Sequence, residues 1–170
     1  MRADLIDVVT AINNSRTGVT ASAFNEATAA SPGSGILAST DTFAITVTSV
    51  DNADSLVYTF SNTTSMDDLV SKINAAGGAG TVQARVNDEG KLVLFNNSGA
   101  TITVTDSTST TTLGQNAATG FDSTATAYNG MLKLESQTDN PISISATGKL
   151  GTASTRSDAA VNTALRTLGL

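Results

Sequence analysis

Apolar residues recur at helical spacing in three segments of the chain. The first segment runs from Ala3 to Asn14, the second from Met66 to Ala76, and the third follows Ser157. Apolar residues at every third or fourth position form a stripe along one face of a helix, and that face packs against the rest of the protein. The pattern therefore predicts three short amphipathic helices.

The second of these helices has the clearest start and end signals. Ser65 suits the N-cap position, and Asp68 three residues later completes a pattern similar to a capping box. Asp67 and Asp68 lie at the positive end of the helix dipole, which favours each negative charge by ~0.3–1 kcal/mol. Gly77-Gly78 follows the last apolar turn and predicts that the helix ends at Ala76.

Alternation of apolar and polar residues predicts strands over much of the remaining chain. The clearest case is Phe43–Thr48, in which every second residue is apolar. A second alternating run, Leu56–Phe60, follows the polar turn Asp51–Asp54, and this arrangement is a hairpin signal. The predicted strands are Thr17–Phe24, Phe43–Thr48, Leu56–Phe60, Thr81–Val86, Lys91–Phe95, Thr101–Thr105, Met131–Leu134 and Ile142–Ser145.

The order of these elements predicts the fold class. From Asp41 to Thr105 the expected order is β-β-α-β-β-β. The polar stretch Asp106–Ala127 is expected to be mostly loop, with Leu113 and Phe121 as apolar anchors. The prediction is an α+β fold with two small β-rich subdomains, each of which packs a short amphipathic helix on antiparallel strands.

Parts of the chain are repeated. In two places an amphipathic helix ends in Ile-Asn and leads into a strand. The first copy contains Asp4-Leu5-Ile6, Ile12-Asn13 and Gly18–Ala21, and the second contains Asp68-Leu69-Val70, Ile73-Asn74 and Gly80–Ala84. A hairpin is repeated at a constant spacing of 40 residues, in which Gly90, Leu92, Leu94, Ile102 and Val104 match Gly130, Leu132, Leu134, Ile142 and Ile144.

The order of the copies predicts a split module. The first helix-and-strand copy has no hairpin directly after it, the second copy is complete, and the spare hairpin comes last. We therefore expect residues 1–38 and 119–170 to form one discontinuous domain, and residues 39–118 to form a domain inserted into it. The alternative is that short β motifs resemble one another by chance.

Composition and charge argue against several classes of function. The 170 residues include no cysteine, histidine or tryptophan, so thiol nucleophiles, the usual general base and the commonest zinc ligands are lacking. The formal net charge is −6, and an acidic surface repels the phosphate backbone of nucleic acids. No apolar run reaches the ~20 residues of a membrane-spanning helix. We expect no enzyme activity, no cofactor, and no nucleic-acid or membrane partner.

Three local motifs are similar to functional sites, and each has a structural explanation that fits better. Gly77–Gly80 follows a helix, whereas a phosphate-binding loop precedes one and carries a lysine. Asp51–Asp54 does not match the alternate spacing of a calcium loop and suits a hairpin turn. Asp67 and Asp68 point about 100° apart on a helix, so they do not converge as paired catalytic carboxylates must. No catalytic, cofactor-binding or metal-ligating residue is predicted.

The motifs also follow one another in a recognisable order. They are Phe43–Val47, Met66–Asn74, Val82–Val86, and Gly90–Leu94 with Ile102–Val104. In this order they resemble the repeat found in the variable regions of bacterial flagellins, which also occurs in hook-associated and filament-cap proteins. Asp4–Phe24 resembles the middle of another copy, and Tyr128–Ser145 resembles a closing hairpin that some flagellins place late in this region.

The resemblance implies a structural role on the outside of the cell. Flagellins polymerise through long terminal helices, and their variable middle projects from the filament as outer domains. No long heptad pattern is present here, so the chain is expected to carry the outer domains of a flagellin in the bacterial flagellum. Contacts with other flagellin subunits would then lie mainly in other regions, and this chain by itself is expected to be monomeric. O-linked glycans on its Ser and Thr residues are a further implication. A filament-cap or hook-associated protein and a surface adhesin module are the alternatives.

Overall fold

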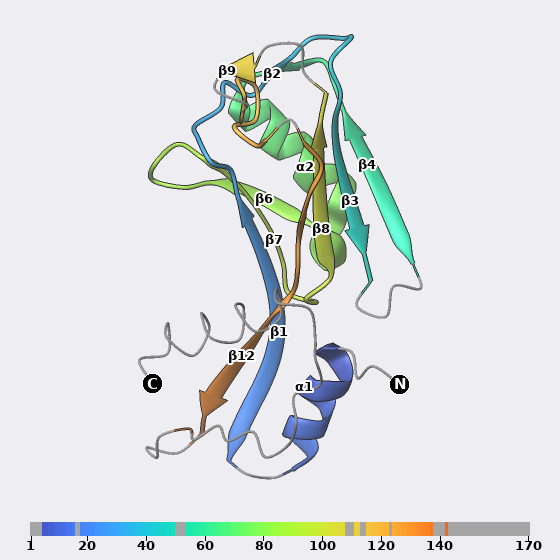
Figure 1. Ribbon diagram of the computed structural model, residues 1–170, viewed down its shortest axis with the longest axis vertical. Coiled ribbons are helices and arrows are strands. Elements are labelled where there is room, and N and C mark those ends of the chain that lie inside the picture. Colours follow the sequence, from blue (N-terminus) through green and yellow to red (C-terminus); the bar gives the residue numbers. More distant parts are fainter. Residues whose placement is uncertain are drawn as a thin grey trace. The chain divides into compact units, whose positions relative to one another are not determined.

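The computed structural model describes residues 5–15, 18–49, 54–107, 111–112, 115–122, 124–137 and 142. The chain divides into two compact units, Met1–Asn140 and Pro141–Leu170. All the helices and strands described below lie in the first unit (Figure 1). The predicted strand Ile142–Ser145, apart from Ile142, and the predicted helix after Ser157 fall outside the described residues.

The described residues form an α+β fold, as predicted. The two helices are α1 (Leu5–Asn14) and α2 (Met66–Thr81). The strands are β1 (Val19–Thr28), β2 (Ile36–Leu37), β3 (Phe43–Thr48), β4 (Ser55–Phe60), β5 (Thr63–Thr64), β6 (Gln83–Val86), β7 (Leu92–Asn96), β8 (Thr101–Asp106), β9 (Thr111–Thr112), β10 (Gln115–Asn116), β11 (Thr126–Tyr128) and β12 (Met131–Ser136).

Most of the predicted elements are confirmed within a few residues. The first strand is the main exception, because β1 continues four residues beyond the predicted end at Phe24, to Thr28. The stretch predicted to be mostly loop contains the short strands β9, β10 and β11. Phe121 is buried in this stretch, as predicted for an anchor, whereas Leu113 lies outside the described residues.

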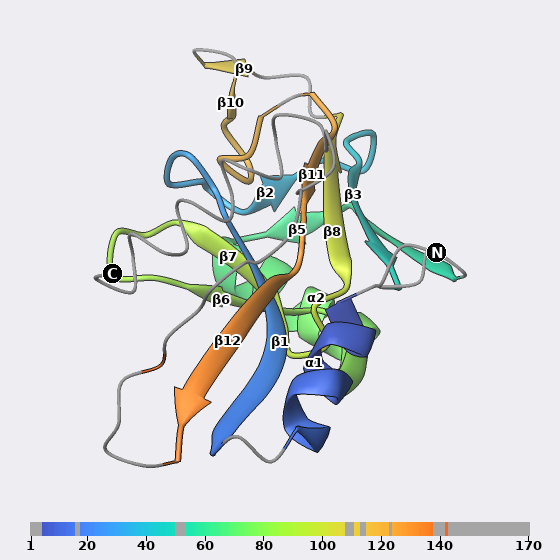
Figure 2. The same cartoon turned by 60° about the horizontal axis from the view of Figure 1, so that its bottom comes forward.

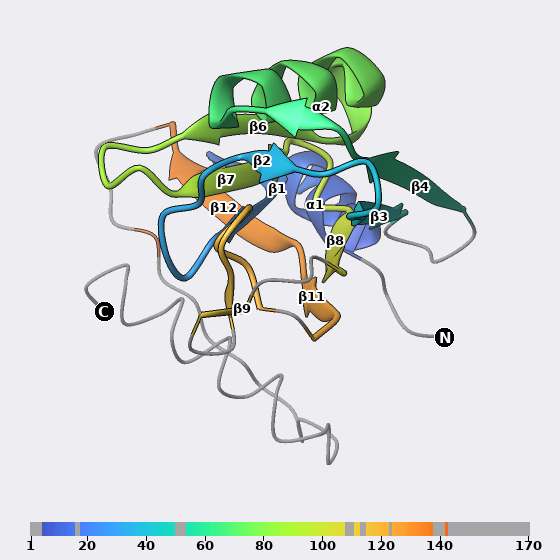
Figure 3. The same cartoon turned by 90° about the horizontal axis from the view of Figure 1, so that it is seen from above.

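Two four-stranded antiparallel sheets organise the fold. Their strand orders are β12-β1-β7-β6 and β11-β8-β3-β4, and two small pairs, β2-β5 and β9-β10, complete the set among the described residues. Strand β1 changes partner along its length, because Val19–Phe24 pairs with β12 and Asn25–Thr28 pairs with β7. Helix α2 lies across β6 and β7 (Figure 3), whereas α1 lies beside β1 and β12 (Figure 2).

The prediction that Gly77-Gly78 ends the second helix is wrong, because α2 continues to Thr81. Tertiary contacts hold this last turn. The Thr81 hydroxyl donates to the Gly77 carbonyl and accepts from the Tyr58 hydroxyl at 3.1 Å. A Cβ at Gly77 would lie only 2.2 Å from the Val82 carbonyl oxygen. The glycine therefore permits a close backbone approach inside the helix and does not stop it.

The predicted cap of α2 is present. Ser65 Oγ accepts a hydrogen bond from the Asp68 amide at 3.2 Å. The Asp68 carboxylate accepts from the Thr64 amide at 3.0 Å and pairs with Lys72 at 3.1 Å. The Thr64 hydrogen bond, followed by the Lys72 ammonium, lowers the pKa of Asp68 below its usual value. Asp68 therefore takes part in the start of the helix, but its carboxylate accepts from Thr64, the residue before the N-cap, where a capping box would use the amide of Ser65 itself.

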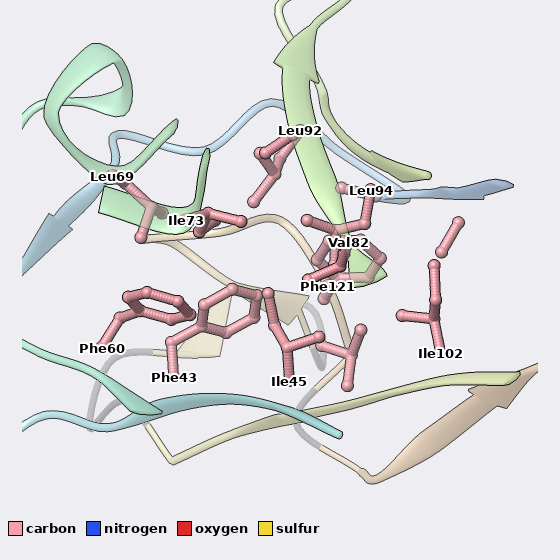
Figure 4. Packing of buried hydrophobic residues seen from close by; sticks show 14 of the residues in the cluster. Phe43, Ile45, Phe60, Leu69, Ile73, Val82, Leu92, Leu94, Ile102 and Phe121 are labelled. Carbon is pink, nitrogen blue, oxygen red and sulfur yellow. The ribbon is translucent and has the colours of Figure 1, made fainter. Parts of the chain in front are cut away.

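The hydrophobic core lies between α2 and the two sheets. The Phe43 ring centroid lies 6.4 Å from that of Phe60 and 6.2 Å from that of Phe121, distances typical of favourable aromatic pairs. Leu69 and Ile73 of α2 reach into the same cluster (Figure 4). The largest fully buried side chains are Phe43, Phe121, Leu37, Ile45, Leu69, Ile73, Leu92, Leu94, Ile102, Val82, Val93 and Val104.

Candidate functional site

Two of the three motifs that are similar to functional sites lie in helix α2. Gly77–Gly80 forms part of α2, and Asp67 and Asp68 lie in its first turn. Residues 51–53 fall outside the described residues, and the Asp54 amide donates to the Ser49 hydroxyl at 3.0 Å. No group of three or more acidic, histidine or cysteine residues that could hold a metal ion occurs in the described ranges. The expectation that the chain has no catalytic residue stays a prediction.

Within the part of the chain that the structure describes, no helix is long and apolar enough to cross a membrane.

The geometry common to the two repeat copies is an asparagine bridge. Asn13 Nδ2 donates to the Ala21 carbonyl at 3.0 Å, and Asn13 Oδ1 accepts from the Ala21 amide at 2.7 Å. Asn74 makes the same two bonds to Ala84, also at 3.0 and 2.7 Å. These are the asparagines of the two Ile-Asn motifs. The repeat seen in the sequence therefore corresponds to one repeated arrangement of helix and strand.

Each bridge occupies the free edge of a strand. Ala84 lies on β6, the last strand of its sheet, and Ala21 lies in the part of β1 that pairs with β12 alone. A side-chain amide presents one donor and one acceptor, as does the backbone of a neighbouring strand. The asparagine thus satisfies edge groups that would otherwise be open to pairing with another chain.

Strand pairing follows the same repeat. Ala21 pairs with Leu134 across β1 and β12, and Ala84 pairs with Leu94 across β6 and β7. Leu134 is the residue that the constant spacing of 40 matches to Leu94. The first copy is therefore built from β1 and β12, which lie more than 100 residues apart in the chain. These two strands pair in the same register as β6 and β7, the consecutive strands of the second copy.

Asn25 lies at the point where β1 changes partner. It is 1% exposed, and its Nδ2 donates to the carbonyls of Ala100 and Tyr128, each at 2.7 Å. Asn96, directly opposite on β7, also donates to the Ala100 carbonyl, at 2.9 Å. Asn25 Oδ1 has no hydrogen-bond partner among the described residues. The side chain joins β1 to Ala100, directly before β8, and to Tyr128, the last residue of β11.

Two glycines allow the backbones to meet beside this asparagine. A Cβ at Gly130 would lie 2.0 Å from the Gly99 carbonyl oxygen, and a Cβ at Gly99 would lie 2.7 Å from the Ala23 Cβ. Gly99 also has a positive φ of 74°, which favours glycine. The chain entering β12 therefore packs directly on the turn between β7 and β8, with no side chain between them.

The segments that lead away from β1 and back towards β12 also bind each other. The Ala30 amide donates to the Gly120 carbonyl at 3.0 Å, and the Gly35 amide donates to the Ala118 carbonyl at 2.7 Å. A Cβ at Gly120 would lie 1.9 Å from the Ser31 carbonyl oxygen. We call these contacts, with those of Asn25, Gly99 and Gly130, the junction.

The junction was not predicted from the sequence. Asn25 directly follows Phe24, the last residue of the predicted strand, and asparagine is depleted in strands. Its buried amide makes contacts 75 and 103 residues away in the chain. The one available signal was that Asn25 interrupts a run of strand-forming residues, and this signal does not identify a partner.

Replacing the bridging asparagines is expected to weaken both repeat copies by similar amounts. Asn74→Ala and Asn13→Ala each remove two hydrogen bonds at a strand edge, which predicts a loss of about 1–2 kcal/mol in the free energy of unfolding. Chemical denaturation measures that loss, and hydrogen exchange should become faster at Ala84 or Ala21. Asn14→Ala is the matched control, because Asn14 is an exposed neighbour on α1. An effect of Asn14→Ala as large as that of Asn13→Ala would contradict the prediction.

Comparison with known proteins finds one family. Residues 33–98 match the family model described as the flagellin hook IN motif. Neither a curated protein nor a solved structure matches the chain. The matched segment begins at Gly33 before β2, contains all of α2, and ends at Ser98 after β7. It therefore covers the bridge between Asn74 and Ala84 and most of the core strands around it.

Proposed function

We propose that this chain, which carries a flagellin-type internal region at residues 33–98, is a structural component of the bacterial flagellar filament. The family match is the observation that carries the proposal. The bridge of Asn74 has an exact counterpart in Asn13, which supports a second copy of the same structural unit in the chain. A protein built from repeated packing units is suited to a structural role.

The proposed location is the outer surface of the filament. The acidic net charge of −6 and the Ser- and Thr-rich segments suit a solvated surface. The proposal includes extracellular localisation, a contribution to motility through the filament surface, and no catalysis. The main contacts with other flagellin subunits would be made by regions outside this chain, which by itself would be monomeric. O-linked glycans on exposed Ser or Thr residues belong to the same proposal.

We propose that the chain is organised as an inserted domain, residues 39–118, within a discontinuous domain of residues 1–38 and 119–170. The matched registers of β1 with β12 and of β6 with β7 support this arrangement. The segments on either side of the insertion contribute to its core, because Leu37 and Phe121 are buried in the same cluster as Phe43. The junction contacts would then hold the inserted domain in a set orientation.

A second candidate function is that of a hook-associated or filament-cap protein. The description of the matched family names the hook, and this observation favours the alternative over an adhesin. Both candidates use the chain as an assembly module, so they differ in where the protein lies along the flagellum.

Immunogold electron microscopy of cells that express the protein separates these candidates. Antibody raised against residues 1–170 should label the filament along its whole length. Antibody absorbed with the same protein serves as the control and should give no label. Gold confined to the filament tip or to the hook junction would transfer the assignment to the cap or hook-associated class. Gold on the cell envelope alone would contradict both assignments.

A further inference from the structure

The two helices present matching apolar stripes. When they are aligned on their bridging asparagines, Asn13 and Asn74, the apolar residues coincide. Leu5, Val8, Val9 and Ile12 of α1 then correspond to Met66, Leu69, Val70 and Ile73 of α2. The sequence pattern alone matched Asp4-Leu5-Ile6 to Asp68-Leu69-Val70. The alignment on the asparagines differs from that match by one helical turn, because the asparagine bridge fixes which residues of each helix face the strand.

The matching stripes differ in burial. Leu69 and Ile73 of α2 are both 0% exposed, whereas α1 has no buried residue. Val8 and Ile12, the counterparts of Leu69 and Ile73, are only partly buried. Ile6 on the same helix is 52% exposed. Val8 and Ile12 are therefore less well covered than Leu69 and Ile73, whereas Leu5 and Val9 are partly buried, as are their counterparts Met66 and Val70.

The second copy shows what covers that face. Helix α2 lies against β6 and β7, and also against β4 and β5, the strands that immediately precede it. The counterparts of β6 and β7 are β1 and β12, and these are the strands that α1 mainly contacts. Among the described residues, α1 has no counterpart of β4 and β5. The side of α1 that corresponds to the side on which α2 contacts β4, the second strand of the β3-β4 hairpin, therefore has no such strand against it among the described residues.

We propose that the apolar face of α1 is a docking surface for an antiparallel β-hairpin of the same kind as β3 and β4. Its strands would carry alternating apolar residues on the side facing Val8 and Ile12. An aromatic residue would occupy the place that Phe60 takes in the core cluster that also contains Leu69 (Figure 4). This proposal rests on the internal repeat alone, so it stands whether or not the chain is a filament subunit.

The geometry favours a hairpin over a second copy of the chain as the occupant. The asparagine bridge sets α1 on β1 as α2 is set on β6, with the same pair of distances. The strands β1 and β12 therefore flank α1 as β6 and β7 flank α2. The side of α1 left without a strand is the one that corresponds to the side of α2 filled by a hairpin. Leu5, Val8, Val9 and Ile12 are all apolar, so the contact is hydrophobic and needs alternating apolar side chains opposite it.

The proposal is tested by supplying such a hairpin. In the extended chain, residues 42–65 are placed directly before Leu5, as they stand before Met66, and replace residues 1–4. Hydrogen exchange of the α1 amides is expected to slow by at least about tenfold relative to the natural chain, because the helix becomes covered. An extension with the same residues in scrambled order should not slow it. Unchanged exchange of residues 66–106 establishes that the rest of the protein remains folded.

Two variants of the extended chain make the result specific. Val8→Asp places a charge on the docking face and should restore fast exchange, whereas Thr10→Asp on the exposed side should leave the protection intact. Equal exchange with the native and scrambled extensions would overturn the proposal. It would also be overturned if Val8→Asp left the protection unchanged.

A second measurement uses the natural chain, which contains no cysteine. A single cysteine at Val8 should react with a maleimide much faster than a single cysteine at Leu69, because the α1 face is open. Slow labelling of both would mean that the α1 face is already covered, which would overturn the proposal. Val8 labelling that slows as protein concentration rises would assign the face to a second copy of the chain and would likewise overturn it.

Discussion

Phe43→Ala is expected to lower the free energy of unfolding by about 3–5 kcal/mol, the usual cost of removing a large buried aromatic side chain. Phe43 is 0% exposed, and its ring lies between those of Phe60 and Phe121. These three rings come from β3, from β4 and from the segment between β10 and β11. Truncation leaves a cavity that no single element can fill by a local shift.

Urea denaturation followed by circular dichroism measures this effect. The matched control is Val57→Ala on the neighbouring strand β4, where the side chain is 63% exposed. Substitutions at exposed positions usually change stability by less than about 0.5 kcal/mol, so the control should unfold close to the natural protein. A loss below about 1 kcal/mol for Phe43→Ala would show that the aromatic cluster does not anchor the core.

Gly120→Ala is expected to destabilise the protein by about 3–4 kcal/mol, because two costs combine at this position. Gly120 has a φ of 77°, a conformation that costs a residue with a side chain about 1–2 kcal/mol. The added Cβ would also lie 1.9 Å from the Ser31 carbonyl oxygen. One of the two backbones must move, and this movement breaks the pairing of Ala30 and Ser31 with Gly120.

Gly90→Ala separates the two costs. Gly90 has a similar φ of 75°, but the nearest atom to an added Cβ is the Pro32 Cβ at an ordinary 3.7 Å. Only the conformational cost of about 1–2 kcal/mol is expected there. Thermal and urea unfolding of the two variants should therefore differ by about 2 kcal/mol, which is the overpacking term. Equal losses in the free energy of unfolding would mean that the backbone at Gly120 can move away from Ser31 at no energetic cost. The junction would then not hold the segment between β10 and β11 in place.

The junction has a consequence for the proposed role in a filament. A protein domain carried on a rotating filament is suited to its task when its parts keep one orientation under load. The buried amide of Asn25 and the direct contact of Gly99 with Gly130 join segments from distant parts of the chain. The contact of Gly99 with Gly130 also leaves little room for adjustment, because backbone meets backbone there without flexible side chains between.

Much of the local structure could be predicted from the sequence. Alternating residues such as Phe43, Ile45 and Val47 specify a strand and the face that it buries. Ser65 with Asp68 specifies where α2 begins, since the cap is made by residues close together in the chain. The repeated Ile-Asn motif indicated two equivalent units, and the two asparagine bridges have the same geometry.

Other features depended on contacts between distant residues. The end of α2 is one, because Gly77 normally favours termination and here accommodates the Val82 carbonyl. The partner of Asn25 is another, since nothing local specifies Ala100 or Tyr128. Phe121 was expected to be an apolar anchor. Its packing against Phe43 depends on how the segment between β10 and β11 lies on β3, which the local sequence does not specify.

The sequence by itself determined most of the secondary structure, the α+β class and the existence of a repeat, because these follow from residue spacing over a few turns or strands. Only the tertiary structure decided how the two copies share β1, where the junction forms, and which apolar face stays open. Those features depend on which distant backbones come close enough to exclude a side chain. Leu69 and Ile73 are buried in α2 while their counterparts Val8 and Ile12 are only partly buried in α1, and the strands β4 and β5 that contact α2 have no counterpart against α1 among the described residues.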